Sequence, residues 1–220
     1  MNVLLLWLAF LLAMSTAQEK PVPVEKEPHH RTVFKNQYVQ VFRVQLDPGK
    51  TGLMHTHFYD DAAVRLSTAT VAADSPGKPI GAPEPVYPGL LSARDNEKKP
   101  HTHRVHNIGT TLFDVIDVQV LKRPTGRPSP AVSSPGAENS KMRVYRYDIG
   151  PGITTSQHVH ARPFLLVAVT DIGLSTISPD RLISSRLVRA GDIQWIASKV
   201  THSLANRGAA KAILVEFELK

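Results

Sequence analysis

The chain of 220 residues contains no cysteine. Disulfide frameworks, thiolate metal sites and cysteine nucleophiles are therefore excluded, because all three need a cysteine sulfur. The sequence also lacks clustered positive charge. Its formal net charge is +7, yet no basic run exceeds two residues, and aromatic residues make up only 6% of the chain. A nucleic-acid interface gathers basic residues on one surface, so we expect no nucleic-acid partner.

Helical patterns are scarce as well. The chain holds 17 prolines, and no segment after residue 17 has a convincing helical period. Residues 212–219 (AILVEFEL) instead alternate between an apolar face and a face that holds Glu216 and Glu218. This alternation is the pattern of a half-buried strand. Residues 164–169 (FLLVAV) form a continuous apolar run that suits the core of a sandwich or barrel. The predicted fold class is all-β.

An apolar run occupies residues 3–14 (VLLLWLAFLLAM) and is followed by the small residues Ser15, Thr16 and Ala17. The run is too short to span a bilayer comfortably, because a transmembrane helix needs about 20 apolar residues. We expect residues 1–17 to be a signal peptide cleaved near Ala17. The mature chain is then periplasmic or secreted, with no membrane contact after cleavage. An N-terminal anchor and a buried core helix are the alternatives.

The chain contains an internal repeat, which predicts two similar domains. The first matched pair is VFRVQLDPG at residues 41–49 and VYRYDIGPG at residues 144–152, and the second is HRVHNIG at residues 103–109 and HSLANRG at residues 202–208. Between the copies, residues 122–140 hold four prolines and almost no large apolar side chains, which is typical of a semi-rigid linker. We expect one domain at residues 18–121, the Pro-rich linker at 122–140 and a second domain at 141–220.

Histidines are spaced as metal ligands would be. In a strand, a His-x-His pair places both imidazoles on the same face, where they can converge on one cation. Ten histidines placed at random would give about 0.5 such pairs. The sequence has three, at His55/His57, His101/His103 and His158/His160. The first and third of these pairs fall at equivalent positions of the repeat, so composition alone does not explain them.

These motifs resemble those of the cupin superfamily. The first cupin motif is a glycine, five residues, His-x-His and then a carboxylate, and the second ends in His, three residues and Asn. In the first copy the matching residues are Gly49, His55, His57, Asp61 in place of Glu, His103 and Asn107. In the second copy they are Gly152, His158, His160, His202 and Asn206. The resemblance covers nearly all of residues 38–121 and 142–219. It implies two tandem double-stranded β-helix (jelly-roll) barrels, a bicupin.

The resemblance also implies the metal ligands. For the first copy they are His55, His57, Asp61 and His103, with Asp60 as an alternative to Asp61 and His101 or His106 as alternatives to His103. For the second copy they are His158, His160 and His202. The second copy has Pro163 and Phe164 where the carboxylate would stand, so three histidines without a carboxylate are expected there. Such sets suit a divalent Fe, Mn, Ni, Cu or Zn ion.

The function implied by the resemblance is that of an exported metal-binding bicupin acting on a small organic molecule, as an oxygenase. A barrel wall that includes Phe42, Leu112 and Ile116 would exclude water from the metal. A non-catalytic sensor, carrier or storage cupin is the alternative, because no nucleophile–base pair stands out. The expected partner is a small-molecule ligand or substrate. A homodimer also fits the resemblance, although no segment of the sequence marks an interface.

Overall fold

The computed structural model describes residues 19–127, 130–131, 133–197 and 199–220. The predicted signal peptide at residues 1–17 lies outside the described residues. Within them, regular structure consists of strands and one short 3-10 helix, η1 (Val24–Lys26), which confirms the all-β prediction. The described part of the chain has no helix with the length and apolar character needed to cross a bilayer.

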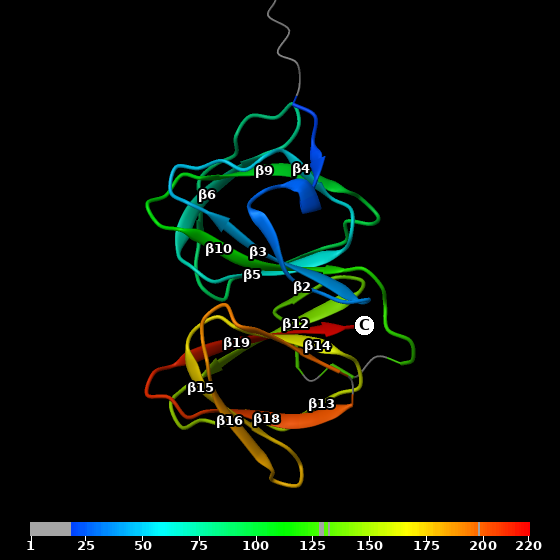
Figure 1. Ribbon diagram of the computed structural model, residues 1–220, viewed down its shortest axis with the longest axis vertical. Helices are drawn as coiled ribbons and strands as arrows, with labels where there is room; N and C mark the ends of the chain where they lie inside the picture. The colour runs from blue at the N-terminus through cyan, green and yellow to red at the C-terminus, as the bar shows by residue number, and fades with distance from the viewer. Residues whose placement is uncertain (1–18, 128–129, 132, 198) are drawn as a thin grey trace, which may run out of the picture.

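The first barrel is built from two five-stranded sheets (Figure 1). The outer sheet has the order β1-β4-β9-β6-β7 and the inner sheet, which faces the other barrel, the order β2-β3-β10-β5-β8. The outer strands are β1 (Val22–Pro23), β4 (His55–His57), β6 (Ala69–Asp74), β7 (Glu84–Val86) and β9 (His101–Asn107). The inner strands are β2 (His30–Lys35), β3 (Val39–Leu46), β5 (Asp61–Arg65), β8 (Leu91–Arg94) and β10 (Phe113–Val120).

The second barrel repeats this plan with one strand fewer. Its inner sheet has the order β11-β12-β19-β14-β17, and its outer sheet the order β13-β18-β15-β16. The inner strands are β11 (Ala137–Glu138), β12 (Met142–Ile149), β14 (Phe164–Ala168), β17 (Ile193–Ile196) and β19 (Ala212–Leu219). The outer strands are β13 (His158–His160), β15 (Ile172–Ile177), β16 (Ile183–Val188) and β18 (Val200–Asn206).

The largest apolar core lies between the two barrels, where their inner sheets pack against each other (Figure 1). The first barrel contributes Val41, Val64 and Val118, among others, and the second Val167 and Phe217. Every second residue of an inner strand points into this shared core and the residues between point into the strand's own barrel. The apolar face of an inner strand therefore packs against the other barrel, and its polar face lines a barrel interior.

This arrangement corrects two sequence-based expectations. The last strand, β19, is buried on both faces rather than half-buried, because its apolar face packs against the first barrel. Of the expected barrel wall, Phe42 does lie in the interior of the first barrel. Ile116 instead points into the shared core, and Leu112 is half-buried just before β10.

The glycine and asparagine of each repeat fix the turn that leads to the His-x-His strand. Gly49 and Gly152 have φ values of 72° and 71°, a left-handed conformation that glycine adopts without a Cβ penalty. The Gly49 N–H donates to the carbonyl of Asn107 and the Gly152 N–H to that of Asn206, each at 2.9 Å. The Asn206 side chain donates to the carbonyl of Ile149, so the matched residues hold the ligand strands in place.

Candidate metal centres

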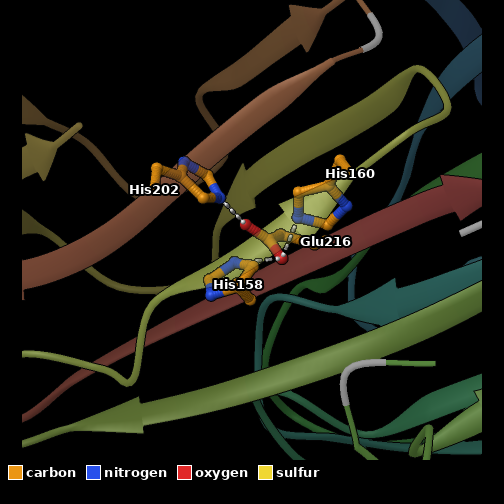
Figure 2. Close-up of side chains that lie close together, drawn as sticks. All are labelled: His158, His160, His202 and Glu216. Atoms are coloured by element: carbon orange, nitrogen blue, oxygen red, sulfur yellow. Dashed lines mark ion pairs between the residues drawn. The ribbon is translucent and has the colours of Figure 1, made fainter. Parts of the chain in front are cut away.

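In the second barrel, three imidazoles and one carboxylate converge (Figure 2). His158 and His160 lie on β13, His202 lies opposite His158 on β18, and Glu216 reaches them from β19. The Nε2 atoms of His158 and His160 lie 3.4 and 3.2 Å from Glu216 Oε2, and His202 Nε2 lies 3.3 Å from Glu216 Oε1. All four side chains are buried. Ligand atoms this close together suit a single cation.

The hydrogen bonds around this cluster turn unprotonated nitrogens inward. His158 Nδ1 donates to the carbonyl of Ser156 at 3.0 Å, and His160 Nδ1 donates to Glu218 Oε1 at 2.9 Å. A neutral imidazole that is protonated on Nδ1 presents a lone pair on Nε2. The Nε2 atoms of His158, His160 and His202 are buried without a hydrogen-bond partner. Lone pairs that face a carboxylate at these distances need a cation or a proton between them, so the residues present fit a metal.

Charge and packing close this site. Burial alone would lower the pKa of His160, but its contacts with Glu216 and Glu218 outweigh burial and raise that pKa to about 9. The Tyr147 hydroxyl donates to Glu216 Oε2 at 2.8 Å, and its ring stacks on His158. Phe164 stacks on His160 with ring centroids 3.9 Å apart. The cluster is thus covered by two aromatic rings.

Glu216 corrects the expectation that the second copy has three histidines and no carboxylate. The cupin motif predicts the carboxylate just after His-x-His, where Phe164 stands. The structure supplies it from the last strand, where Glu216 lies on the face that the alternation had assigned to solvent. One available signal was the repeat itself, because Glu216 aligns with Asp117 at the same offset of 99 residues that relates His202 to His103.

The first barrel brings together the three equivalent histidines. His55 and His57 lie on β4 and His103 on β9, where it pairs with His55. His57 Nε2 lies 3.2 Å from His55 Nε2 and 3.3 Å from His103 Nε2. Of the two alternatives to His103, His101 lies farther from His57, with ring centroids 6.4 Å apart. The other, His106, bonds to Asp74 and Thr51, outside this cluster.

The first barrel also fixes its imidazoles from behind. His55 Nδ1 donates to the carbonyl of Leu53 at 2.8 Å, and His57 Nδ1 lies 2.9 Å from Asp61 Oδ2. Burial would lower the pKa of His57, but its hydrogen bond with Asp61 and the negative charges of Asp117 and Asp61 together outweigh burial and raise that pKa. The structure therefore places Asp61 behind His57, on the Nδ1 side, where a carboxylate orients a metal-binding imidazole. Asn96 Nδ2 donates to the same carboxylate oxygen at 2.8 Å.

The position equivalent to Glu216 is Asp117, which is one methylene shorter. Its Oδ2 atom lies 3.8 Å from His57 Nδ1 and is buried without a hydrogen-bond partner. Burial and the nearby charge of Asp61 raise the pKa of Asp117 to about 7. In the first barrel, two carboxylates thus sit behind His57. A carboxylate that faces the three Nε2 atoms, as Glu216 does, has no counterpart among the described residues of this barrel.

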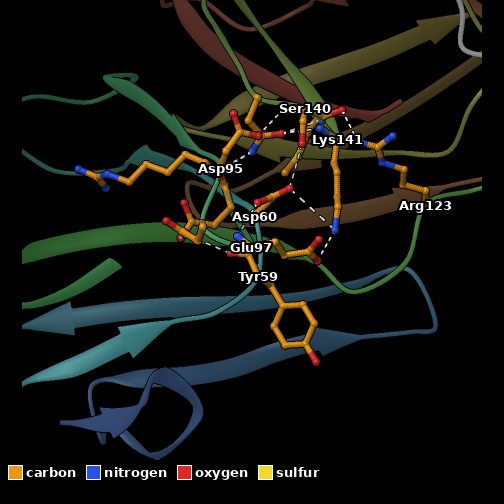
Figure 3. Close-up of polar contacts among 12 residues, drawn as sticks. Tyr59, Asp60, Asp95, Glu97, Arg123, Ser140 and Lys141 are labelled. Atoms are coloured by element: carbon orange, nitrogen blue, oxygen red, sulfur yellow. Dashed lines mark hydrogen bonds and ion pairs between the residues drawn. The ribbon is translucent and has the colours of Figure 1, made fainter. Parts of the chain in front are cut away.

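Asp60, the alternative to Asp61, belongs to a polar network between the barrels (Figure 3). Its carboxylate accepts hydrogen bonds from Glu97 N at 2.9 Å and from Ser140 Oγ at 3.0 Å. Lys141 Nζ lies 3.8 Å from Asp60 and bonds to Glu97. Asn139 Nδ2 in turn donates to the backbone carbonyl of Asp61 at 2.8 Å. Asp60 therefore joins the barrels rather than the imidazole cluster.

A fourth imidazole enters the first barrel from the N-terminal arm. His30, at the start of β2, has a ligand atom within 4.8 Å of those of His55 and His57. Its Nδ1 donates to Glu27 Oε2 at 2.6 Å. Glu27 is buried and also accepts from the Leu53 N–H at 3.1 Å, which holds the arm over the cluster. Sequence reasoning missed His30 because it precedes the repeat and its approach to His55 depends on the fold.

The first cluster opens onto a cavity of about 100 Å³. All four histidines line it, together with Asp61, Asp117, two arginines and several apolar residues. The cavity found in the second barrel is lined by other residues, among them Leu166, Arg186 and Leu214, and not by its histidines. The two barrels thus differ in kind, because the first cluster faces a space for a ligand and the second is covered by aromatic rings.

The paired sheets of each barrel and the similarity to solved structures show the cupin (jelly-roll) fold, which the chain contains in two copies. No family model matches the chain. The chain is 30% identical over 96 residues to the β-alanine degradation protein BauB of Pseudomonas aeruginosa. The matched region covers 44% of this chain and 99% of BauB.

Two solved structures share the fold over most of the chain. AerE from Microcystis aeruginosa is similar with a TM-score of 0.57 and 13% identity, covering 88% of this chain and 98% of that one. A point mutant of salicylate 1,2-dioxygenase from Pseudoaminobacter salicylatoxidans is similar with a TM-score of 0.56 and 10% identity, covering 84% of this chain and 72% of that one. At these identities the similarity establishes the fold alone.

Proposed function

We propose that the protein is an exported, metal-dependent bicupin that transforms a small organic molecule in the first barrel, by oxygenase-type chemistry. One observation carries the proposal: the cavity of about 100 Å³ is lined by the imidazoles of His30, His55, His57 and His103. A concave site with apolar walls and a few convergent polar groups is the usual form of a small-molecule site. A metal at its base would lie next to the bound molecule.

The residues of both clusters fit a divalent transition metal. In the first barrel His55, His57 and His103 would hold it, with His30 within reach, and in the second His158, His160, His202 and Glu216 would. Such an ion acts as a Lewis acid toward substrate oxygens or dioxygen. Imidazole-rich sites suit Fe, Cu, Ni or Zn, and a carboxylate in the set also suits Mn.

The chain's own residues have separable tasks in the first barrel. Leu53 and Asp61 keep Nδ1 of His55 and His57 protonated, so that Nε2 of each imidazole stays free to bind metal. Asp117, whose pKa of about 7 is raised by burial and Asp61, can hold or release a proton near neutral pH. The apolar side chains of β3 and β10 exclude water from the cavity.

A non-catalytic metal-binding protein is the second candidate. The second cluster favours it, because Tyr147 and Phe164 cover the imidazoles and Glu216 completes a four-residue set. A closed set of four ligands is typical of a structural metal, whereas a catalytic metal keeps an open position. On this reading the second barrel stores a metal or stabilises the fold, and the chemistry belongs to the first barrel.

Metal content and oxygen uptake test the proposal. We expect mature protein beginning at Gln18, purified without chelators, to hold about two metals per chain, with His57→Ala and His160→Ala each losing one. His106→Ala is the matched control, since His106 lies outside both clusters. Oxygen uptake is then measured with phenolic compounds, sugars and short organic acids. Uptake that is lost in His57→Ala but kept in His160→Ala supports the enzyme, and metal binding without any uptake favours the second candidate.

Export is tested separately. Cell fractionation of the full chain, followed by N-terminal sequencing, should find mature protein beginning near Gln18 outside the cytoplasm. Full-length protein that keeps Met1 and stays in the cytoplasm would contradict the proposed signal peptide, without bearing on the metal sites.

A further inference from the structure

Two arginines line the cavity of the first barrel from neighbouring strands. Arg65 is the last residue of β5 and Arg94 the last residue of β8. On β5, Ala62 and Val64 point into the core shared by the barrels, so Arg65 and Ala63 point the other way, into the cavity. The same alternation on β8 turns Arg94 inward. Both guanidinium groups therefore face the space next to the imidazole cluster.

Neither guanidinium is neutralised by a direct ion pair. Among the described residues, no carboxylate oxygen lies within 4.0 Å of a side-chain nitrogen of Arg65 or Arg94. Arg65 Nη1 donates to Ser92 Oγ at 2.6 Å, while its Nε is buried without a hydrogen-bond partner. Asp61 and Asp117 act on Arg65 only at longer range. A buried N–H donor without a partner is unfavourable, and a ligand oxygen can satisfy it.

The second barrel provides an internal comparison. Arg65 pairs with Val115 on the central strand β10, and the residue at the same register in the second barrel is Ala168, which pairs with Leu214. By the same register, Arg94 is replaced by Ile196. At these two register positions, arginines thus occur only in the first barrel, whose cavity is lined by its histidines. The fold that the two barrels share therefore does not require them.

We propose that the cavity of the first barrel binds the carboxylate of a small organic acid through Arg65 and Arg94. This inference rests on the proposed function, because it names the substrate class of the same site. A guanidinium matches a carboxylate geometrically, with two parallel N–H donors. Once the acid is held at the arginines, its remaining atoms face the imidazoles.

The other walls and the size of the cavity define the rest of the ligand. Apolar side chains complete the lining: Val44, Leu46, Val105, Phe113 and Val115. They suit a short hydrocarbon or a small ring. A cavity of about 100 Å³ is somewhat smaller than the roughly 150 Å³ that holds benzene in a protein interior. The part of the acid that lies within the cavity therefore has only a few carbon atoms beyond the carboxylate.

Binding of matched probes tests this inference. Propionate, its neutral analogue propionamide and inorganic phosphate are titrated by calorimetry into the zinc-reconstituted, full-length mature protein. We expect propionate to bind at least tenfold more tightly than propionamide and than phosphate. Arg65→Gln and Arg94→Gln should each weaken propionate binding at least tenfold and leave propionamide binding unchanged. Arg127→Gln is the matched control, because Arg127 is exposed and lies outside the cavity.

Equal affinity for acid and amide, tighter binding of phosphate, or unchanged propionate binding in both arginine variants would each overturn the inference. Arg94 is exposed, so Arg94→Gln should fold even if Arg65→Gln does not. The same titration in His57→Ala separates this inference from the proposed function. Arginine-dependent propionate binding that persists in His57→Ala would support the acid site independently of the metal. Wild-type protein that binds propionate in this way without any oxygen uptake would contradict the enzyme alone. Oxygen uptake that is indifferent to both arginines would do the reverse.

Discussion

Replacing Glu27 by glutamine should destabilise the protein at neutral pH and not at low pH. Glu27 is 2% exposed and accepts hydrogen bonds from the Nδ1 atoms of His29 and His30, at 2.8 and 2.6 Å, and from the Leu53 N–H. Burial would raise its pKa, but these hydrogen bonds outweigh burial and lower the pKa from 4.5 to about 2. The shift makes Glu27 a stabilising anion in the folded state.

The size and direction of the effect follow from this shift. A difference of about 2.5 pKa units corresponds to at most about 3 kcal/mol of folding free energy. Because the pKa of Glu27 is lower in the folded chain, this stabilisation is complete above pH 4.5 and is lost as pH falls toward 2. The amide of a glutamine at this position cannot ionise. The variant should therefore be less stable than wild type by up to about 3 kcal/mol at pH 7, with the gap closing as the pH falls toward 2.

Urea denaturation of the metal-free proteins at several pH values between 3 and 7 measures this gap. Glu25→Gln is the matched control, since Glu25 is an exposed acid on the same arm. A gap between Glu27→Gln and wild type that stays constant over this range would show that the loss is one of packing. No gap at pH 7 would refute the argument that Glu27 anchors the arm.

Three further predictions concern the second barrel and the shared core. Glu216→Gln should weaken metal binding at the second site by at least about a hundredfold and leave the first site occupied, because glutamine removes the negative charge that faces three imidazoles. Competition with a chromophoric chelator measures the two affinities. Two equally tight sites in the variant would contradict the prediction. In metal-free protein, His160 should remain protonated up to about pH 9. Adding metal should abolish this titration in histidine NMR spectra, because a bound metal displaces the proton. A titration that metal leaves unchanged would exclude His160 as a ligand. Phe217→Ala should lower the free energy of unfolding by about 3–5 kcal/mol and destabilise both barrels together, because Phe217 is 1% exposed in the core that they share. Hydrogen exchange measures this barrel by barrel. Loss of protection in the second barrel alone would argue against one common core.

The histidines that the sequence singled out are gathered by the fold because their signal is local. His-x-His on a strand fixes the direction of two imidazoles, and the repeat identifies the strand that carries the third. His30 has no such pattern, since it approaches His55 only after the arm folds over the barrel. Arg65 and Arg94 are likewise 29 residues apart and meet only at the cavity.

Glu216 was misassigned for a different reason. Alternation along residues 212–219 was interpreted with the apolar face inside and the polar face in water, as in an isolated domain. In the folded chain the apolar face of β19 packs against the other barrel, so the polar face lines the interior. The period of the pattern was correctly recognised. Which face meets solvent depends on the second copy of the domain, and that information is not local.

Alternate residues of an inner strand therefore serve two different purposes. On β19, Val215, Phe217 and Leu219 determine how the barrels assemble, while Glu216 and Glu218 determine the chemistry of one barrel. A point substitution can change a residue on one face of the strand and leave the other face unchanged. A duplicated domain can therefore acquire a new ligand set and still pack against the other barrel. A deletion or insertion of a single residue would turn the packing residues into the barrel interior and the polar residues into the shared core along the rest of the strand. Divergence between the copies is thus expected to proceed by substitution within these strands, with length changes confined to the loops that connect them.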